Sequence, residues 1–452
     1  MAATSLRHSM AADEDGEGDR QMVSIEGTDG APGGADDRVH ALVAECGRRA
    51  RAGSAGLTEA PDSVIDSALT AMADRLVAAE SEILAANQRD VETARSAGMS
   101  PALQDRLRLD AARLKGMADQ LRLLAEAPFP ARETPLRSLP GGLRLSERRR
   151  PVGVIGANFE ARPNVTVDVA SQLVKSRNAG VLRTGSAALT SANALHQHVI
   201  AAGLRDVGLD PDAIQLLPDA SRASAVALVR QTDLIPLVIL RGSGDATRSL
   251  GAEAARHGVR TLAHADGGGV LYVDAAADLD RATELLVTGL DRLGVCNRVN
   301  LLLVHRDVAG AALPRFEAAL TELGVRASLP PYDHPVGYEW ALDSGREATV
   351  TIAEVTDLAE AVTIANTETS GLAATIVTED RAAAERFIAS AVGTGVFWNA
   401  STRLLDGFKL HGVPETGINV DHVPGPRGPV TFQDLYLRQY VVVPEDAPGV
   451  PG

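Results

Sequence analysis

One cysteine near the middle of the chain has the surroundings of a nucleophile. Cys296 lies in the segment 294–298 (Gly-Val-Cys-Asn-Arg), with Arg292 and Arg298 on either side. Cations beside a loop thiol lower its pKa from about 8.5 towards neutrality, and the thiolate is the reactive form. A lone cysteine is more often a small buried hydrophobe, so composition alone favours a structural role. We expect that structural role for Cys46, which lies on an amphipathic stretch.

Lysine is rare enough in this chain to be informative. Only three of the 44 basic residues are lysines, namely Lys115, Lys175 and Lys409. Arginine and lysine differ in geometry and hydration, so a lysine kept in such a background favours a specific role. The alternative for each of them is a solvated position on the surface.

Composition excludes several classes of function. The 452 residues have a formal net charge of −15, with 45% hydrophobic and 23% charged residues, as in globular proteins. An acidic chain with 3% aromatic residues argues against nucleic acid as a partner. The longest apolar run, Leu234–Leu240, is too short to cross a membrane. With two cysteines and no signal-peptide pattern, we expect a cytoplasmic protein without disulfides or a metal site.

The elements that would position Cys296 begin with a helical region. Residues 1–38 hold nine acidic and three basic residues, and we expect them to form a disordered acidic extension. Helical periodicity follows in residues 39–51, 63–87 and 102–127. Ser63, together with Asp66 three residues later, predicts the cap of the second helix.

An extended arm and two series of alternating strands and helices come next. Residues 128–150, with a Gly-Gly turn at 141–142, predict a hairpin that packs against another subunit. Up to residue 265 and again over 266–398, strands alternate with helices, which predicts two α/β domains with doubly wound parallel sheets. Residues 399–452 are irregular except for a predicted strand over 435–443, which could pair with the arm.

Several motifs resemble those of the γ-glutamyl phosphate reductases. The resemblance is carried by the segments 153–166 (Gly-Val-Ile-Gly-Ala-Asn-Phe-Glu-Ala-Arg-Pro-Asn-Val-Thr), 182–186 (Leu-Arg-Thr-Gly-Ser), 295–297 (Val-Cys-Asn) and 399–403 (Asn-Ala-Ser-Thr-Arg). They occur in the family's order, over roughly residues 39–445.

The resemblance implies an aldehyde dehydrogenase fold. Residues 39–265 would then form the cofactor domain, 266–398 the domain that carries the thiol, and 399–452 a return to the cofactor domain ending in an arm strand. The family reduces L-glutamyl 5-phosphate with NADPH in proline biosynthesis. In that chemistry the thiolate of Cys296 displaces phosphate to give a thioester, which is then reduced to the aldehyde. Asn164 would stabilise the oxyanion with the Cys296 backbone N–H.

The resemblance also implies the residues that bind the cofactor and the substrate. The cofactor NADPH or NADP would be contacted by six residues: Lys175, Gly185, Ser186, Arg241, Gly242 and Glu415. The substrate would be contacted by five: Arg162, Asn297, Ser401, Thr402 and Arg403.

The sequence departs from the family pattern around the expected substrate cleft. Polar positions of the family are occupied by other residues, at Gly269, Val270, Asn300 and Leu372. A site that loses hydrogen-bonding partners loses discrimination for a polar substrate. Reduction of a different acyl phosphate or acyl donor is therefore the first alternative. A catalytically silent relative that binds a partner kinase is the second.

Partners follow from the same resemblance. We expect a homo-oligomer built through the arm and a small acyl phosphate as substrate. Glutamyl phosphate is labile, so a glutamate 5-kinase is an expected partner.

Overall fold

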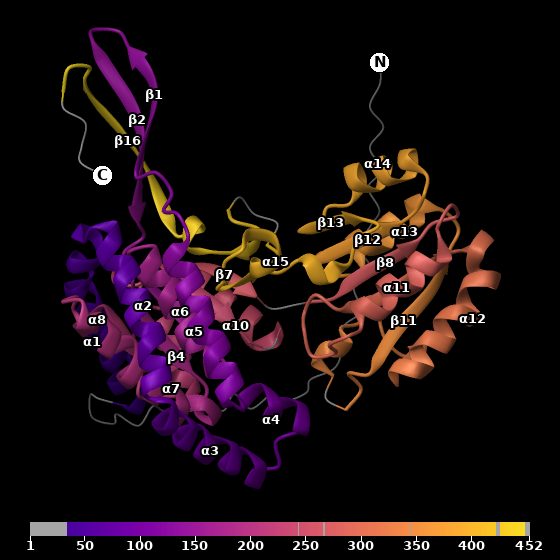
Figure 1. The fold of residues 1–452 in the computed structure, drawn as a ribbon, viewed down its shortest axis with the longest axis horizontal. Helices are drawn as coiled ribbons and strands as arrows, with labels where there is room; N and C mark the ends of the chain where they lie inside the picture. Colours follow the sequence, from indigo (N-terminus) through magenta and orange to yellow (C-terminus); the bar gives the residue numbers. More distant parts are fainter. Residues whose placement is uncertain (1–33, 243, 265–266, 344, 422–424, 448–452) are drawn as a thin grey trace, which may run out of the picture.

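The computed structural model describes residues 34–447 except 243, 265–266, 344 and 422–424. Two α/β parts lie side by side, and an antiparallel arm projects from the first (Figure 1). The described chain opens with five helices: α1 (Ala35–Glu59), α2 (Asp62–Ala78), α3 (Glu80–Ser96), α4 (Pro101–Leu107) and α5 (Ala111–Glu126).

These helices differ from the sequence predictions at their ends. Residues 1–33 of the expected acidic extension lie outside the described residues, but α1 already begins at Ala35. Its first turn holds two acidic side chains, which the positive end of the helix dipole stabilises. The predicted cap at Ser63 is wrong, because Pro61 precedes the first turn of α2 and no side chain caps it.

The first sheet is parallel, with the strand order β5-β4-β3-β6-β7. Helices cover both of its faces, and Cys46 of α1 is buried in the core on one of them, as expected. Because the order reverses beside β3, a crevice forms at the carboxyl ends of β3 and β6, where open α/β sheets bind ligands. The strands are β3 (Val154–Phe159), β4 (Ala179–Thr184), β5 (Ile214–Leu216), β6 (Leu237–Arg241) and β7 (Arg260–His264). The helices between them are α6 (Asn164–Lys175), α7 (Leu189–Leu195), α8 (Ala201–Asp206), α9 (Arg222–Leu228) and α10 (Gly244–Arg256).

The second sheet is also parallel, with the order β10-β11-β9-β8-β12-β13. Its helices are α11 (Leu279–Gly289) and α12 (Arg306–Leu323) on one face, with α13 (Leu358–Thr367) and α14 (Arg381–Ser390) on the other. The strands are β8 (Gly269–Val273), β9 (Val299–His305), β10 (Arg326–Ser328), β11 (Thr349–Val355), β12 (Ala373–Val377) and β13 (Gly395–Trp398). Cys296 lies in the turn that enters β9, so it belongs to the amino edge of this sheet.

The arm consists of β1 (Glu133–Leu139), β2 (Leu143–Pro151) and β16 (Tyr436–Pro444), which pair antiparallel. Gly141 and Gly142, with φ of 83° and 69°, form the hairpin turn predicted from the sequence. The predicted pairing of a late strand with the arm is confirmed by β16. Between the second sheet and β16 the chain returns to the first part through α15 (Gly407–His411), β14 (Gly417–Asn419) and β15 (Gly428–Val430) (Figure 1).

A buried lysine joins three helices of the first part. Lys175, at the end of α6, is fully buried, and its Nζ donates to the Asp66 carboxylate of α2 at 2.7 Å. Nζ also donates to the Ala125 carbonyl at 3.1 Å and lies 3.8 Å from the centroid of the Phe129 ring. Burial lowers the pKa of Lys175, while Asp66 raises it. Lys175 therefore joins α2, α5 and α6.

Replacing this lysine tests its structural role. Lys175→Met leaves Asp66 without its partner, and we expect the free energy of unfolding to fall by about 2–3 kcal/mol, because Asp66 is partly exposed and regains water. Urea denaturation measures the change. Lys115→Met is the matched control, because the Lys115 side chain is 80% exposed, 4.0 Å from Asp119. Equal stability of the two variants would contradict the role.

Candidate active site

Cys296 lies where the two parts of the chain approach each other. Its turn is packed against the glycines that enter β8: Gly268 N–H donates to the Cys296 carbonyl at 2.6 Å. A side chain at position 267 would place its Cβ 2.7 Å from the Cα of Cys296, so only glycine fits there. The Gly267 N–H donates to the Glu339 carboxylate at 2.8 Å, which brings Glu339 to the same place.

Three side chains hold the thiol loop, residues 291–298, to the returning chain, and we call them the thiol clamp. Asn297, Thr402 and Arg403 form it. The Thr402 hydroxyl donates to the Asn297 carbonyl at 2.9 Å, and the Asn297 amide donates to the Leu405 carbonyl at 2.9 Å. The Arg403 guanidinium donates to the Asn297 side-chain oxygen and, at 2.9 Å, to Asp291. The two ends of the loop are therefore tied to one segment.

The structure shows how most of the substrate-binding residues expected from the sequence are held within the protein. Thr402 is fully buried and Asn297 is 3% exposed. The Thr402 hydroxyl donates to the backbone of the thiol loop, and the Asn297 side-chain amide donates to the backbone of the segment that carries Thr402. Ser401 accepts from the Arg403 N–H at 3.2 Å and is 9% exposed. Asn297, Thr402 and Arg403 therefore hold the thiol loop, and the assignment of these residues and of Ser401 to the substrate stays a prediction.

The electrostatics of Cys296 also differ from the expectation. Burial raises the pKa of the Cys296 thiol to about 11, although Arg162 and Arg241 act in the opposite direction. Arg298 does not face the thiol: its fully buried guanidinium donates to the carbonyls of Glu347 and Thr349. The predicted lowering of the pKa is therefore wrong for this structure, because burial outweighs the two cations.

Asn164 begins α6 beside the cleft and is held by the next turn of that helix. Its amide donates to the Asp168 carboxylate at 2.8 Å. Burial raises the pKa of Asp168 to about 6. Arg241, Asn164 and Arg162 each act to lower this pKa, and burial outweighs them. An amide nitrogen has two hydrogens, so Asn164 can keep this bond and still offer a second donor to a ligand.

Glu415 and His264 complete the polar lining of the cleft. Glu415 accepts from the Gly407 N–H at 2.9 Å, and burial raises its pKa. Glu415 acts electrostatically on Cys296 and on Asp168, and raises the pKa of both. Burial, with Arg241 and Arg162, lowers the pKa of His264 to about 3, so this histidine is neutral.

Residues expected to bind the cofactor separate into two groups. Gly185 and Ser186 follow β4, and Arg241 and Gly242 end β6, so all four lie at the carboxyl edge of the first sheet. Lys175 is not among them: it is buried at the far end of α6, as described above, and its amine is bound to Asp66 and Ala125. The resemblance assigned it to the cofactor, and the structure contradicts that assignment.

Sequence reasoning missed several groups of the cleft. His264 at the end of β7 and Glu339 had no signal in the sequence, because long stretches of chain separate them from Cys296. Asp168 could have been found, since it is four residues after Asn164 on one helix face. Arg106 of α4 also reaches the thiol loop, where its Nη2 donates to the Gly294 carbonyl at 3.2 Å.

One wall of the thiol pocket is apolar. Cys296 packs against a cluster formed by Leu372, Ala373, Leu405 and Ile418. These residues come from the start of β12, the thiol-clamp segment and β14. Leu372 is one of the positions where the sequence departs from the family pattern, and it is fully buried in this wall.

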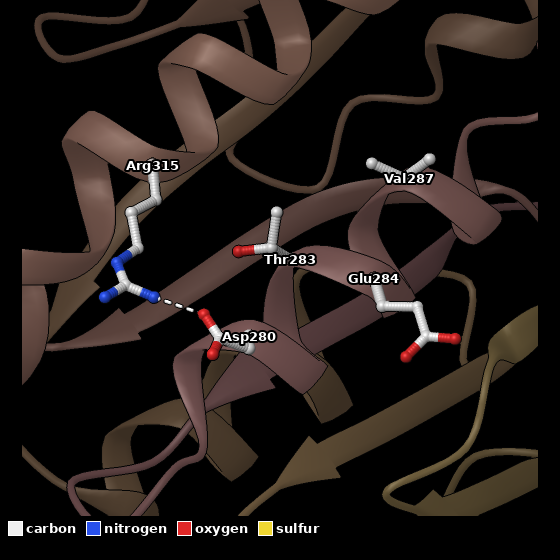
Figure 2. A pocket seen from close by; sticks show the side chains of 5 residues that line it. All are labelled: Asp280, Thr283, Glu284, Val287 and Arg315. Carbon is white, nitrogen blue, oxygen red and sulfur yellow. Dashed lines mark hydrogen bonds and ion pairs between the residues drawn. The ribbon is translucent and has the colours of Figure 1, made fainter.

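A surface hollow lies away from Cys296. It is found between α11 and α12 on the outer face of the second part, where Arg315 donates to Asp280 at 2.5 Å (Figure 2). Thr283, Glu284 and Val287 complete its lining, and no expected site residue belongs to it. Among the described residues, no cluster of His, Cys, Asp and Glu could hold a metal ion, and no helix is long and apolar enough to span a bilayer.

Comparisons with known proteins agree with this geometry. A model described as "Aldehyde dehydrogenase family" matches residues 67–336 and 349–426. γ-Glutamyl phosphate reductases of Synechococcus sp. (strain WH7803) and Thermobifida fusca (strain YX) are each 37% identical, covering 82% and 89% of this chain and 86% and 97% of their own.

Solved structures show the same relationship. The γ-glutamyl phosphate reductase of Thermotoga maritima has a TM-score of 0.82 and 28% identity, over 90% of this chain and all of its own. An acetylating aldehyde dehydrogenase of Geobacillus thermoglucosidasius shares the fold, with a TM-score of 0.68 and 15% identity over 92% of this chain and 99% of its own. The resemblance noted in the sequence is confirmed, and the chain belongs to the aldehyde dehydrogenase family of oxidoreductases, among the γ-glutamyl phosphate reductases.

Proposed function

We propose that this protein reduces L-glutamyl 5-phosphate to L-glutamate 5-semialdehyde with NADPH, in proline biosynthesis in the cytoplasm. The observation that carries the proposal is the position of Cys296, which packs against Leu372 and Leu405 and is influenced electrostatically by Arg162 and Arg241 of the first part. The relatives named γ-glutamyl phosphate reductase support the choice of substrate.

The crevice beside β3 fits a dinucleotide cofactor. A Cβ at Gly242 would lie 3.3 Å from the Glu160 carboxylate, so a glycine keeps this edge open. Gly185 and Ser186 start the turn that follows β4, where the first N–H groups of a helical turn can meet a phosphate. Arg241 and Glu415 would contact the part of the cofactor nearest the thiol. When bound, NADPH supplies the hydride that reduces the acyl carbon.

The residues of the chain divide the remaining chemistry among them. The thiol must lose its proton before it attacks, and we assign Glu415, which acts electrostatically on Cys296 and whose pKa is raised by burial, as the carboxylate that accepts it. The Cys296 thiolate then attacks the acyl carbon, and phosphate leaves to give the thioester. The second amide hydrogen of Asn164 and the Cys296 N–H would stabilise the oxyanion that develops.

The apolar wall around Leu372 favours one alternative. The side chains of Leu372, Ala373 and Ile418 have no hydrogen-bonding groups, so the part of a substrate that packs against them would be held by apolar contact. The same thioester chemistry on a less polar acyl donor is therefore the second candidate function. The silent relative is opposed by the retention of the thiol, of two arginines that act electrostatically on it and of Asn164 with a free amide hydrogen.

The arm supports the proposal of a homo-oligomer. Leu136, Leu437, Tyr440 and Val442 on its strands are 48–60% exposed, and apolar surface of this kind is usually covered by another chain. A kinase that delivers the labile acyl phosphate would be a further partner.

The reverse reaction tests the proposed function. With glutamate 5-semialdehyde, phosphate and NADP, the wild-type protein should form NADPH, and Cys296→Ala should lower the rate by about a thousandfold or more. Absorbance at the NADPH band follows the reaction. Cys46→Ala is the control, because Cys46 is buried in the helical core. A wild-type protein without turnover would contradict the choice of substrate, and an active Cys296→Ala variant would contradict the nucleophile.

The pH dependence of alkylation tests the state of the thiol. Because the folded protein binds the Cys296 proton up to a pKa of about 11, the thiolate fraction rises about tenfold for each pH unit between 7 and 10. The rate of iodoacetamide labelling, followed by mass spectrometry of the Cys296 peptide, should rise in the same way. Free cysteine, whose rate levels off near pH 9, is the reference. A plateau for Cys296 below pH 8 would show that the arginines outweigh burial.

A further inference from the structure

Arg106 of α4 connects the first part of the chain to the second. Its Nη2 donates to the Gly294 carbonyl at 3.2 Å and to the Ala341 carbonyl at 3.4 Å. Gly294 belongs to the thiol loop, and Ala341 to the segment between β10 and β11. A guanidinium Nη2 has two hydrogens, one for each of these carbonyls. One side chain of the first part thus holds two segments of the second.

The segment that contains Ala341 is itself attached to the surroundings of the thiol. Trp340 is 1% exposed, and its indole N–H donates to the Thr351 hydroxyl of β11 at 3.0 Å. Glu339 accepts from the Gly267 N–H at 2.8 Å, and Gly267 lies directly against Cys296. Both carbonyls that Arg106 binds are therefore fixed relative to Cys296.

The backbone on either side of Arg106 is fixed within the first part. Arg113 of α5 donates to the Asp105 carbonyl at 2.5 Å, and the Asn87 amide of α3 donates to the Leu107 carbonyl at 2.9 Å. The base of the Arg106 side chain therefore has a firm support. Its guanidinium passes this position on to the thiol loop, through hydrogen bonds that the positive charge strengthens.

The same helix packs against the turn where we place the cofactor phosphates. This turn, residues 185–188, is called the cofactor turn below. Leu107 is fully buried and packs with Ala188, the last residue of the cofactor turn. Leu107 thus contacts the cofactor turn, while the preceding residue, Arg106, reaches the thiol loop. The distance between the two depends on the Arg106 bonds, and an error of about 1 Å in such a distance can slow a reaction about a hundredfold.

We propose that Arg106 is a positioning residue that holds the thiol loop at its working distance from the cofactor turn. The inference rests on the proposed function and adds to it a residue that acts through the protein backbone. In this role Arg106 touches neither substrate nor cofactor. Loss of its two hydrogen bonds should therefore slow the chemical step and leave the binding of substrate and cofactor unchanged.

Steady-state kinetics of the reverse reaction test this role. Arg106→Gln should lower kcat about tenfold or more and keep the KM values for phosphate and NADP within about twofold. Arg106→Lys should recover part of kcat, because an ammonium keeps the charge and loses the planar fork of donors. Arg108→Gln is the matched control, since the Arg108 side chain follows α4 and is 59% exposed. It should match the wild type.

Three outcomes of these measurements would overturn the proposal. A raised KM for phosphate or NADP with an unchanged kcat would make Arg106 a ligand contact. Unchanged kcat and KM values would give it no role in the reaction. A slower Arg106→Gln variant that also unfolds at lower urea concentration, with no recovery in Arg106→Lys, would make it a general support of the fold.

Hydrogen exchange on the same full-length variants needs no substrate. The backbone amides of residues 291–298 should exchange about fivefold faster in Arg106→Gln than in Arg108→Gln, with α2 and α5 unchanged. Faster exchange in a protein that does not turn over glutamate 5-semialdehyde would support the positioning of the loop and contradict the substrate. Unchanged exchange in a protein that does turn it over would overturn the role of Arg106 and leave the proposed function standing.

Discussion

The closure of the thiol loop onto the returning chain is the constraint on which the rest of the site depends. Cys296 belongs to the amino edge of the second sheet, while Arg162 and Arg241 belong to the carboxyl edge of the first. Thr402 and Arg403, on the segment after β13, bind Asn297, and Arg106 of α4 binds the Gly294 carbonyl from the first part. These contacts hold the thiol loop near Arg241 and Arg162, which lie 55 and 134 residues before Cys296 in the chain.

The cleft balances burial against charge. Packing against Leu372 and Leu405 shields the thiol in part from water, burial raises its pKa, and Arg162 and Arg241 oppose that rise without overcoming it. The same enclosure makes every electrostatic interaction with a bound anion stronger than it would be in water. A protein that holds its nucleophile protonated until substrate and base are in place avoids side reactions of a permanent thiolate.

Local patterns predicted much of the fold and less of the site. The alternation of strands and helices, the glycine turn of the arm and the pairing of β16 with it follow from short-range periodicity and turn chemistry. Cys296 could be singled out because its loop is short and flanked by charge. The roles of Lys175 and Thr402 could not, because both depend on which distant surfaces bury them. The sequence alone does not distinguish a polar residue that binds a ligand from one that donates to a backbone carbonyl of its own chain.

Hydrogen exchange in a Thr402→Val variant tests the thiol clamp most directly. The substitution keeps the volume of a fully buried side chain and removes the hydroxyl that donates to the Asn297 carbonyl. We predict exchange of the backbone amides of residues 294–298 about fivefold faster than in the wild type, from the loss of about 1 kcal/mol of hydrogen bonding, with β8 and β9 unchanged. Unchanged exchange in the thiol loop would show that the loop holds its conformation without the clamp.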